Sequence, residues 1–162
     1  GISKVRNLKE LVNGINDAFR YDFKVIVEEG IDARELECAV LGNENPQAST
    51  IGEIIPSHEF YDYEAKYFDD GKSQLIIPAG VSQKHIEMIK EYSIKAYVEL
   101  GCSGLSRVDF FMDKKTGKIY LNEINTMPGF TPFSMYPQLW KHEGVSYTDL
   151  IDRLIQLGLK ER

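Results

Sequence analysis

The sequence predicts an α+β protein with a largely antiparallel sheet. Three segments space their apolar residues as amphipathic helices do, and the strand-like segments follow one another directly, joined by short polar turns. Strands that alternated one by one with helices would indicate a parallel sheet instead. The chain has 162 residues, 43% of them hydrophobic and 27% charged, which fits one domain, residues 1–162, with one sizeable core.

Composition excludes several classes of function. The formal net charge of −6 gives no general attraction to nucleic acid or anionic lipid. No apolar run approaches the roughly 20 residues of a membrane helix, and no leader-like segment opens the chain. Cys38 and Cys102 form no CxxC pair, so neither a disulfide framework nor a thiolate zinc site is predicted. We therefore expect a cytoplasmic protein with no nucleic-acid or membrane partner.

The first half of the chain begins with a helix and continues with strands. Helical spacing of apolar residues predicts a helix over residues 7–20, with Asn7 as its N-cap. Short β-branched or alternating segments predict strands at 23–29, 35–43 and 51–57, arranged as an antiparallel meander.

A long loop and a second helix follow. Residues 58–80 mix aromatic and acidic residues without helical or strand periodicity, which favours a long ordered loop, and loops of this length are often functional. A helix is predicted over 82–101, with Ser82 as N-cap and Gly101 at its end. Its apolar side is predicted to consist of Ile86, Ile89, Ile94, Tyr97 and Val98.

The last third contains a hairpin and a final helix. Strands at 104–113 and 118–126 are joined by the turn KKTG. Three prolines are expected to prevent a regular element across residues 128–137. A helix then begins at Ser146, with Asp149 in the position of a capping-box carboxylate.

The hairpin carries a polar pattern that an ordinary strand does not need. Glu123 and Asn125 stand two residues apart in one strand, and Arg107 and Asp109 do so in the other. Side chains at i and i+2 of a strand leave the same face of the sheet. With a simple register across the KKTG turn, Asp109 lies opposite Glu123, and all four side chains gather on one face.

Two interpretations of this cluster remain open. A solvated ladder of salt bridges is common on a two-stranded ribbon. Alternatively, Asp109, Glu123 and Asn125 offer the oxygen ligands that Mg²⁺ prefers, and Arg107 can stabilise charge that develops in a transition state. The second interpretation is favoured because Asn is poor in strands, because apolar flanks indicate a buried central hairpin, and because a Gly-containing loop follows.

The stretches RVDFFMD, LNEINTMPGFTPFSMYP and FYDYEAKY resemble the D-alanine–D-alanine ligase family of ATP-grasp enzymes, and the resemblance extends from Gly1 to about residue 160. It implies an ATP-grasp fold and ATP-dependent joining of two D-alanine molecules through an acylphosphate, for peptidoglycan precursor synthesis. It also implies that this chain is the C-terminal portion, without the N-terminal half, of an enzyme that forms a homodimer at full length. An ATP-grasp ligase for another substrate and a non-catalytic nucleotide-binding module are the alternatives.

The resemblance assigns roles at matching positions. Asp109, Glu123 and Asn125 would hold two Mg²⁺ or Mn²⁺ ions, with Glu123 bridging them. Arg107 and the backbone N–H of Gly129 would form the oxyanion hole. Ser134 and the backbone of Met135 would hold the carboxylate of the acceptor D-alanine, although Ser134 could simply cap the following turn.

The ATP-binding positions are spread along the chain. The resemblance implies that adenine lies against Glu28, the backbone of Glu29 and Ile31, and Phe60. It implies that Glu35 accepts the ribose hydroxyls and that Lys66 contacts the phosphates. Asn122 is a further predicted ATP-binding residue. Tyr67 would close a lid formed by the loop 58–80, and a tyrosine there points to D-alanine as the acceptor. Lys66 and Glu28 could equally be ordinary solvated side chains.

Overall fold

The computed structural model describes residues 1–55 and 74–160, in two compact units. The first unit is Gly1–Asp32, and the second begins at Ala33. Within the described residues, no helix is both long enough and apolar enough to cross a membrane.

The first unit contains the predicted N-terminal helix, α1 (Leu8–Ala18). Asn7 caps it by accepting a hydrogen bond from the Glu10 N–H (3.0 Å), and the Glu10 carboxylate in turn accepts from the Asn7 side-chain amide (2.7 Å). The strand predicted at 23–29 is wrong, because residues 24–32 have no regular structure and Phe23 is 90% exposed. Its β-branched residues suit a strand, but a strand also needs a neighbour for its backbone groups. No pairing to this segment is found within the described residues.

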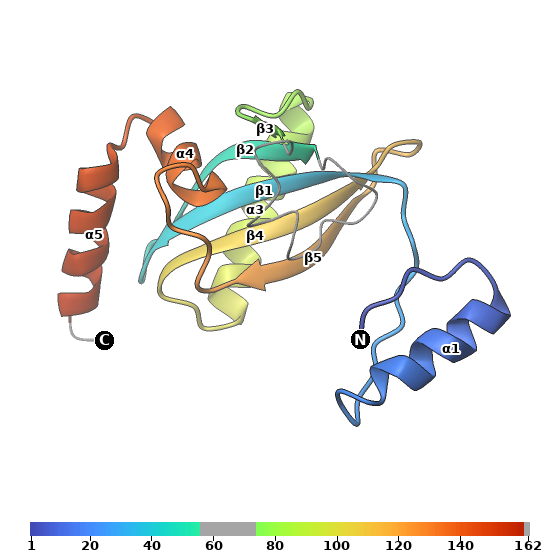
Figure 1. The fold of residues 1–162 in the computed structure, drawn as a ribbon. Coiled ribbons are helices and arrows are strands. Elements are labelled where there is room, and N and C mark those ends of the chain that lie inside the picture. Colours follow the sequence, from blue (N-terminus) through green and yellow to red (C-terminus); the bar gives the residue numbers. More distant parts are fainter. Residues whose placement is uncertain (56–73, 161–162) are drawn as a thin grey trace. The chain divides into compact units, whose positions relative to one another are not determined.

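The second unit is built on a five-stranded antiparallel sheet (Figure 1). Its strands in the order β3-β2-β1-β4-β5 are β3 (Gln74–Ile76), β2 (Gln47–Ile55), β1 (Ala33–Gly42), β4 (Gly104–Asp113) and β5 (Ile119–Asn125). The antiparallel sheet and the hairpin are as predicted. Strand β3 lies inside the stretch predicted to be a loop. Within the described residues β5 is an edge strand of the sheet, so the hairpin is not central as predicted. The rest of the predicted loop lies outside the described residues.

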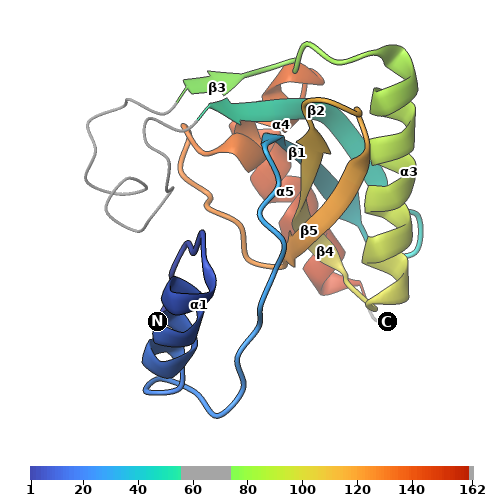
Figure 2. The same cartoon turned by 90° about the vertical axis from the view of Figure 1, so that its right-hand side faces the viewer.

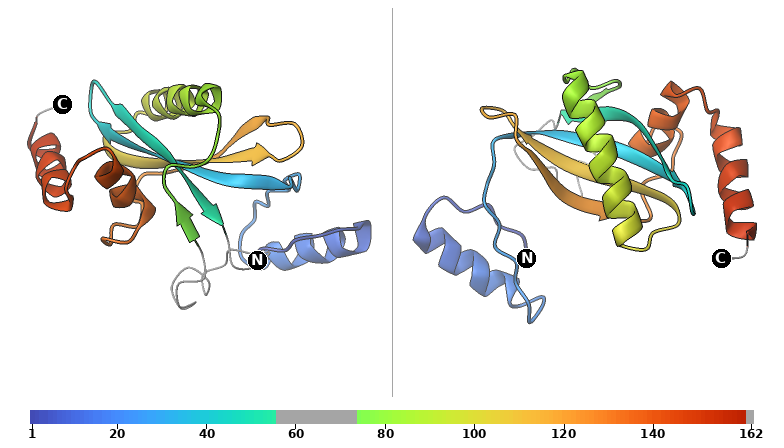
Figure 3. Two further views of the ribbon diagram at one scale, coloured as in Figure 1. Left: turned by 90° about the horizontal axis from the view of Figure 1, so that it is seen from above. Right: turned by 180° about the vertical axis from the view of Figure 1, so that it is seen from behind.

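One face of the sheet is covered by α3 (Gln83–Glu99), which begins at the predicted N-cap Ser82 (Figure 3). Ile89 and Tyr97 are fully buried against alternate residues of β1, and the Tyr97 hydroxyl donates to the Gly42 carbonyl (2.7 Å). Val98, predicted on the apolar side, is 56% exposed. It directly follows Tyr97, so a turn of about 100° per residue carries it away from the sheet.

The opposite face carries α4 (Met135–His142) and α5 (Tyr147–Leu159) over part of its length (Figure 2). Helix α4 corrects the expectation that prolines exclude a regular element up to residue 137. Pro137 stands at the third helical position, where a backbone N–H has no acceptor within the helix, so its missing donor costs nothing there. Helix α5 starts as predicted, since Ser146 Oγ accepts from the Asp149 N–H (3.1 Å).

Helix α3 ends in a Schellman motif at the predicted glycine. Gly101 has φ +64°, its N–H donates to the Val98 carbonyl (3.0 Å), and the Cys102 N–H donates to the Tyr97 carbonyl (3.0 Å). These bonds satisfy carbonyls that the helix end would otherwise leave unpaired. The left-handed backbone at Gly101 is therefore part of how α3 stops and turns toward β4.

Gly101→Ala should lower the free energy of unfolding by about 1–2 kcal/mol, because a β-carbon is strained in the left-handed region even where space is open. Gly80→Ala is the matched control: neither glycine has atoms within 4 Å of an added β-carbon, and Gly80 does not have a positive φ. Urea unfolding of both variants measures the difference. Equal free energies of unfolding for the two variants would contradict the role assigned to the left-handed backbone of Gly101.

Candidate active site

The hairpin brings the predicted cluster together. In the register between β4 and β5, Arg107 pairs with Asn125 and Asp109 pairs with Glu123, as predicted. All four side chains therefore leave the same face of the sheet, the face on which α4 and α5 pack farther along.

The pairing of Asp109 with Glu123 results from a register shift within the hairpin and not, as predicted, from a simple register across the KKTG turn. Next to the turn, Met112 pairs with Ile119 and Phe110 with Leu121, a register that would place Asn122 opposite Asp109. The register shifts between Asp109 and Phe110, so that Asn122 becomes the extra residue of a β-bulge. A one-residue shift exchanges the two faces of a strand. The bulge therefore puts Glu123, and not Asn122, into the cluster.

The four side chains are in direct contact. Arg107 grips Asp109 through two bonds, from Nε to Oδ1 (2.7 Å) and from Nη2 to Oδ2 (2.7 Å). The Asn125 side-chain amide donates to Asp109 Oδ2 (2.8 Å) and to Glu123 Oε1 (3.3 Å). The predicted convergence is confirmed, and the cluster is a connected network centred on Asp109.

Two glutamates of β1 extend the cluster. Glu37 pairs with Asp109 in the register and is 5% exposed, and its Oε2 lies 3.1 Å from Arg107 Nε. Glu35, predicted to bind ribose, projects from the same face of β1 and is partly buried. Glu37 was missed because its alternation with Leu36 and Cys38 is typical of a strand with one solvated face. Pairing on both sides is not the cause of the burial, because Glu35 has the same two neighbouring strands and is only partly buried.

The electrostatics of the cluster are strongly negative. Glu37, Asp109 and Glu123 form a row across β1, β4 and β5, Glu35 lies beside it, and Arg107 is the cation in contact with the row. Carboxylates directly opposite one another repel. Burial would lower the pKa of Arg107, but its hydrogen bond with Asp109 and the neighbouring carboxylates raise it above its ordinary value, so the guanidinium stays charged. Burial, and then the charge of Asp109, raise the pKa of Glu35.

The donor set fits a hard divalent cation. Carboxylate and amide oxygens are the ligands that Mg²⁺ and Mn²⁺ prefer. No group of three His, Cys, Asp or Glu side chains within residues 1–55 and 74–160 is arranged to hold a metal ion. In this structure the Asn125 amide nitrogen faces the carboxylates of Asp109 and Glu123, and its oxygen would join them in a three-ligand set only if the amide were turned over.

The loop after β5 is closed by hydrogen bonds around Ser134. Its hydroxyl accepts from the Thr131 N–H (3.1 Å) and shares a bond with the Thr131 hydroxyl (2.9 Å). A β-carbon on Gly129 would lie 3.1 Å from that hydroxyl. Ser134 thus has the structural role of a turn cap, whatever else it binds. The Met135 side chain is 3% exposed and packs in the core over Gly52, leaving its backbone as the only part suited to the predicted role.

The structure does not test the remaining predicted positions against the cluster. Glu28, Glu29 and Ile31 belong to the first unit, and Phe60, Lys66 and Tyr67 lie outside the described residues. Asn122 is exposed at the bulge. These positions stay predictions.

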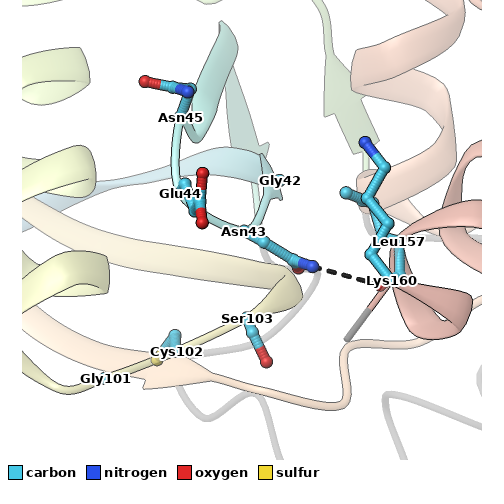
Figure 4. Close-up of a pocket in the computed structure, with 9 residues that line it drawn as sticks. All are labelled: Gly42, Asn43, Glu44, Asn45, Gly101, Cys102, Ser103, Leu157 and Lys160. Carbon is cyan, nitrogen blue, oxygen red and sulfur yellow. Dashed lines mark hydrogen bonds between the residues drawn. The ribbon is translucent and has the colours of Figure 1, made fainter. Parts of the chain in front are cut away.

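A cavity of about 500 Å³ lies at the other end of the sheet, beside the β1–β2 turn and the end of α5 (Figure 4). Asn43 spans its wall, accepting from the Gly104 N–H (3.0 Å) and donating to the Leu157 carbonyl (3.1 Å). None of the predicted site residues lines it. The candidate active site is therefore the open carboxylate cluster and not this cavity.

Comparison with known proteins identifies the chain. Residues 1–156 match the protein family described as "D-ala D-ala ligase C-terminus". A D-alanine–D-alanine ligase of Thermoanaerobacter sp. (strain X514) is 56% identical over 160 residues, which are 99% of this chain and 45% of that protein. The chain thus spans about half the length of the curated relatives it matches.

Solved structures give the same answer. The D-alanine–D-alanine ligase of Coxiella burnetii matches with a TM-score of 0.82 and 38% identity over 94% of this chain and 39% of that one. The VanG D-Ala:D-Ser ligase of Enterococcus faecalis matches with a TM-score of 0.80 and 41% identity over 93% and 43%. The sheet and its helices are therefore those of an ATP-grasp ligase. Within that class, the chain belongs to the D-alanine–D-alanine ligase family and corresponds to its C-terminal portion.

Replacing Glu35 should change stability in a pH-dependent way. Because its folded-state pKa is raised, the ionised carboxylate opposes folding above that pKa and ceases to do so below the unfolded value near pH 4. Glu35→Gln should therefore raise the free energy of unfolding at pH 7, with the gain shrinking as the pH falls toward about 4. Urea unfolding at several pH values measures this, with the exposed Glu99→Gln as control. A Glu35→Gln variant that is less stable at pH 7 would refute the prediction.

Proposed function

We propose that this chain forms the ATP-binding and metal-binding part of an enzyme that joins two D-alanine molecules into D-alanyl-D-alanine. The observation that supports this most is the row Glu37–Asp109–Glu123, in which carboxylates meet across three strands around one guanidinium. Such an excess of negative charge is costly unless a cation accompanies it. The family assignment supplies the reaction that uses that cation.

The first step transfers the γ-phosphoryl group of ATP to the carboxylate of one D-alanine, giving an acylphosphate and ADP. Bound Mg²⁺ or Mn²⁺, two ions in this proposal, would neutralise phosphate charge during this transfer. Asp109, Glu123 and Asn125 would hold the ions, with Glu123 as the ligand that the two ions share. Glu35 accepts ribose hydroxyls from the same face of β1, which sets the nucleotide across the sheet.

In the second step the amine of another D-alanine attacks the acylphosphate carbonyl, and phosphate leaves. The carbonyl oxygen gains negative charge, and Arg107 is the group that the cluster offers for stabilising it, together with the Gly129 N–H. The backbone of Met135 and the Ser134 hydroxyl hold the carboxylate of the acceptor. Arg107 suits this role because the neighbouring carboxylates raise its pKa, so the guanidinium stays positively charged.

Other parts of the proposal rest on the resemblance alone. Adenine would lie against Glu28, Glu29 and Ile31, with Phe60 packed on it and Asn122 nearby, while Lys66 contacts phosphates and Tyr67 closes the lid. The full-length protein would act as a homodimer in the cytoplasm, in peptidoglycan precursor synthesis.

Glu123→Gln in the full-length protein should abolish turnover, because it removes one negative charge from between two dications. The assay is D-alanine-dependent release of ADP and formation of dipeptide with Mg-ATP. Glu99→Gln is the control and should keep wild-type kcat, because Glu99 is an exposed residue of α3, which covers the other face of the sheet. An undiminished kcat for Glu123→Gln would refute the metal assignment.

The acceptor is a separate prediction, because one of the solved structures that match is named a D-Ala:D-Ser ligase. The tyrosine at position 67 favours D-alanine as the acceptor. Competition between equal concentrations of D-alanine and D-serine, with the products separated by mass, should give mostly D-alanyl-D-alanine. A majority of D-alanyl-D-serine would keep the proposed chemistry and overturn the choice of acceptor.

A further inference from the structure

Glu37 is a buried carboxylate to which neither the resemblance nor the proposed mechanism gives a task. It lies in β1 with 5% of its surface exposed. Strand β1 is the central strand of the sheet, between β2 and β4 (Figure 1). A carboxylate in such a place costs stability unless a partner offsets its desolvation. Its register partner is another carboxylate, Asp109, which adds repulsion.

The partner of Glu37 is the guanidinium of Arg107. Arg107 Nε donates to Asp109 Oδ1 (2.7 Å) and lies 3.1 Å from Glu37 Oε2, so the guanidinium is hydrogen-bonded to a carboxylate of its own strand and forms an ion pair with one of the adjacent strand. Only 11% of the Arg107 side chain is exposed. The guanidinium is therefore anchored from β1 as well as by its own strand.

The two anchors differ in what they are free to do. In the proposed function Asp109 is a metal ligand, so a bound cation draws on the same oxygens that Arg107 grips. Glu37 is not a member of the proposed metal set, and it is the carboxylate whose contact with Arg107 a cation leaves in place. An oxyanion donor must be held closely, because a displacement of about 1 Å can cost on the order of a hundredfold in rate.

We propose that Glu37 is a positioning residue, which holds the Arg107 guanidinium at the reacting centre when Asp109 binds metal. This inference rests on the proposed function for its kinetic consequence. The anchoring contact itself stands independently of that function.

The chain offers a matched control on the opposite face of the sheet. Glu53 is 9% exposed and binds Arg34 through two bonds, from Nε to Oε1 (2.7 Å) and from Nη2 to Oε2 (2.6 Å). It is thus another carboxylate buried in a neighbouring strand and paired with an arginine. Glu53 pairs with Leu36 in the register, so it projects toward α3 and away from the cluster.

The test compares Glu37→Gln, Glu37→Asp and Glu53→Gln in the full-length protein. Gln keeps the shape of Glu37 without its charge, and Asp keeps the charge but withdraws it by one methylene. We expect both Glu37 variants to lower kcat at least tenfold with the KM for ATP within about twofold of wild type. Glu53→Gln should lower the melting temperature but leave kcat unchanged. A melting curve for each variant separates loss of fold from loss of rate, and Glu37→Asp serves if Glu37→Gln does not fold.

A spectroscopic readout reports the contact without using activity. The Nε–H of Arg107 is donated to Asp109, and its exchange with solvent measures how firmly the guanidinium beside Glu37 is held. Its ¹⁵N-resolved signal, identified by its loss in Arg107→Lys, should exchange faster in Glu37→Gln than in wild type, with and without Mg-ATP. In Glu53→Gln it should be unchanged. An unchanged Arg107 signal in Glu37→Gln would overturn the positioning role, and so would wild-type kcat in both Glu37 variants.

The outcomes distinguish this inference from the proposed function. If the wild-type protein forms no dipeptide while the Arg107 signal responds to Glu37→Gln, the proposed function fails and the anchoring contact remains. If the wild type is active and both Glu37 variants match it, the positioning role alone fails.

Discussion

The guanidinium of Arg107 is the interaction on which the cluster depends. Glu37, Asp109 and Glu123 lie opposite one another on three adjacent strands, an arrangement that repulsion alone would pull apart. Arg107 is hydrogen-bonded to Asp109, forms an ion pair with Glu37 and is itself largely buried. Removing it would leave Glu37 buried without that counter-charge, which is far more costly than losing an exposed ion pair. Arg107 therefore makes the row possible before it does any chemistry.

The sheet face that carries the cluster is divided along its strands. Ala39 and Leu41 of β1 pack under α4 and α5 with Met135, Leu139 and other apolar residues. Glu35 and Glu37, on the same face of the same strand, belong to the charged half. The apolar half supplies hydrophobic stabilisation of the order of 25 cal/mol per Å² buried, which offsets the electrostatic strain of the other half. Strand β1 contributes residues to both the apolar half and the charged half, and it pairs with a strand on each side. The geometry of the site therefore depends on a strand whose residues 36–42 are all buried.

Local patterns in the sequence predicted most elements because those elements have local causes. Asn7, Ser82 and Ser146 cap the helices they were expected to cap, and the pairing of Asp109 with Glu123 is as predicted. The errors arise where distant residues decide. Residues 23–29 have the composition of a strand, but composition does not supply a neighbouring strand. Glu37 has the sequence pattern of a solvated position, but Arg107 and Asp109 of the neighbouring strand β4 lie beside it and it is buried.

The convergence of the four hairpin side chains was predicted correctly but for an incomplete reason, because the prediction did not include a bulge in β5. Spacing at i and i+2 shows that Glu123 and Asn125 share a face, but not which face, because the pairing next to the turn would send both toward α3. The bulge at Asn122 reverses that outcome. Bulges also twist an edge strand and so discourage further strands from pairing with it. The extra residue Asn122 thus turns Glu123 and Asn125 toward the face that carries Asp109. Glu123 remains exposed in β5, an edge strand of the described sheet, and is accessible from solvent.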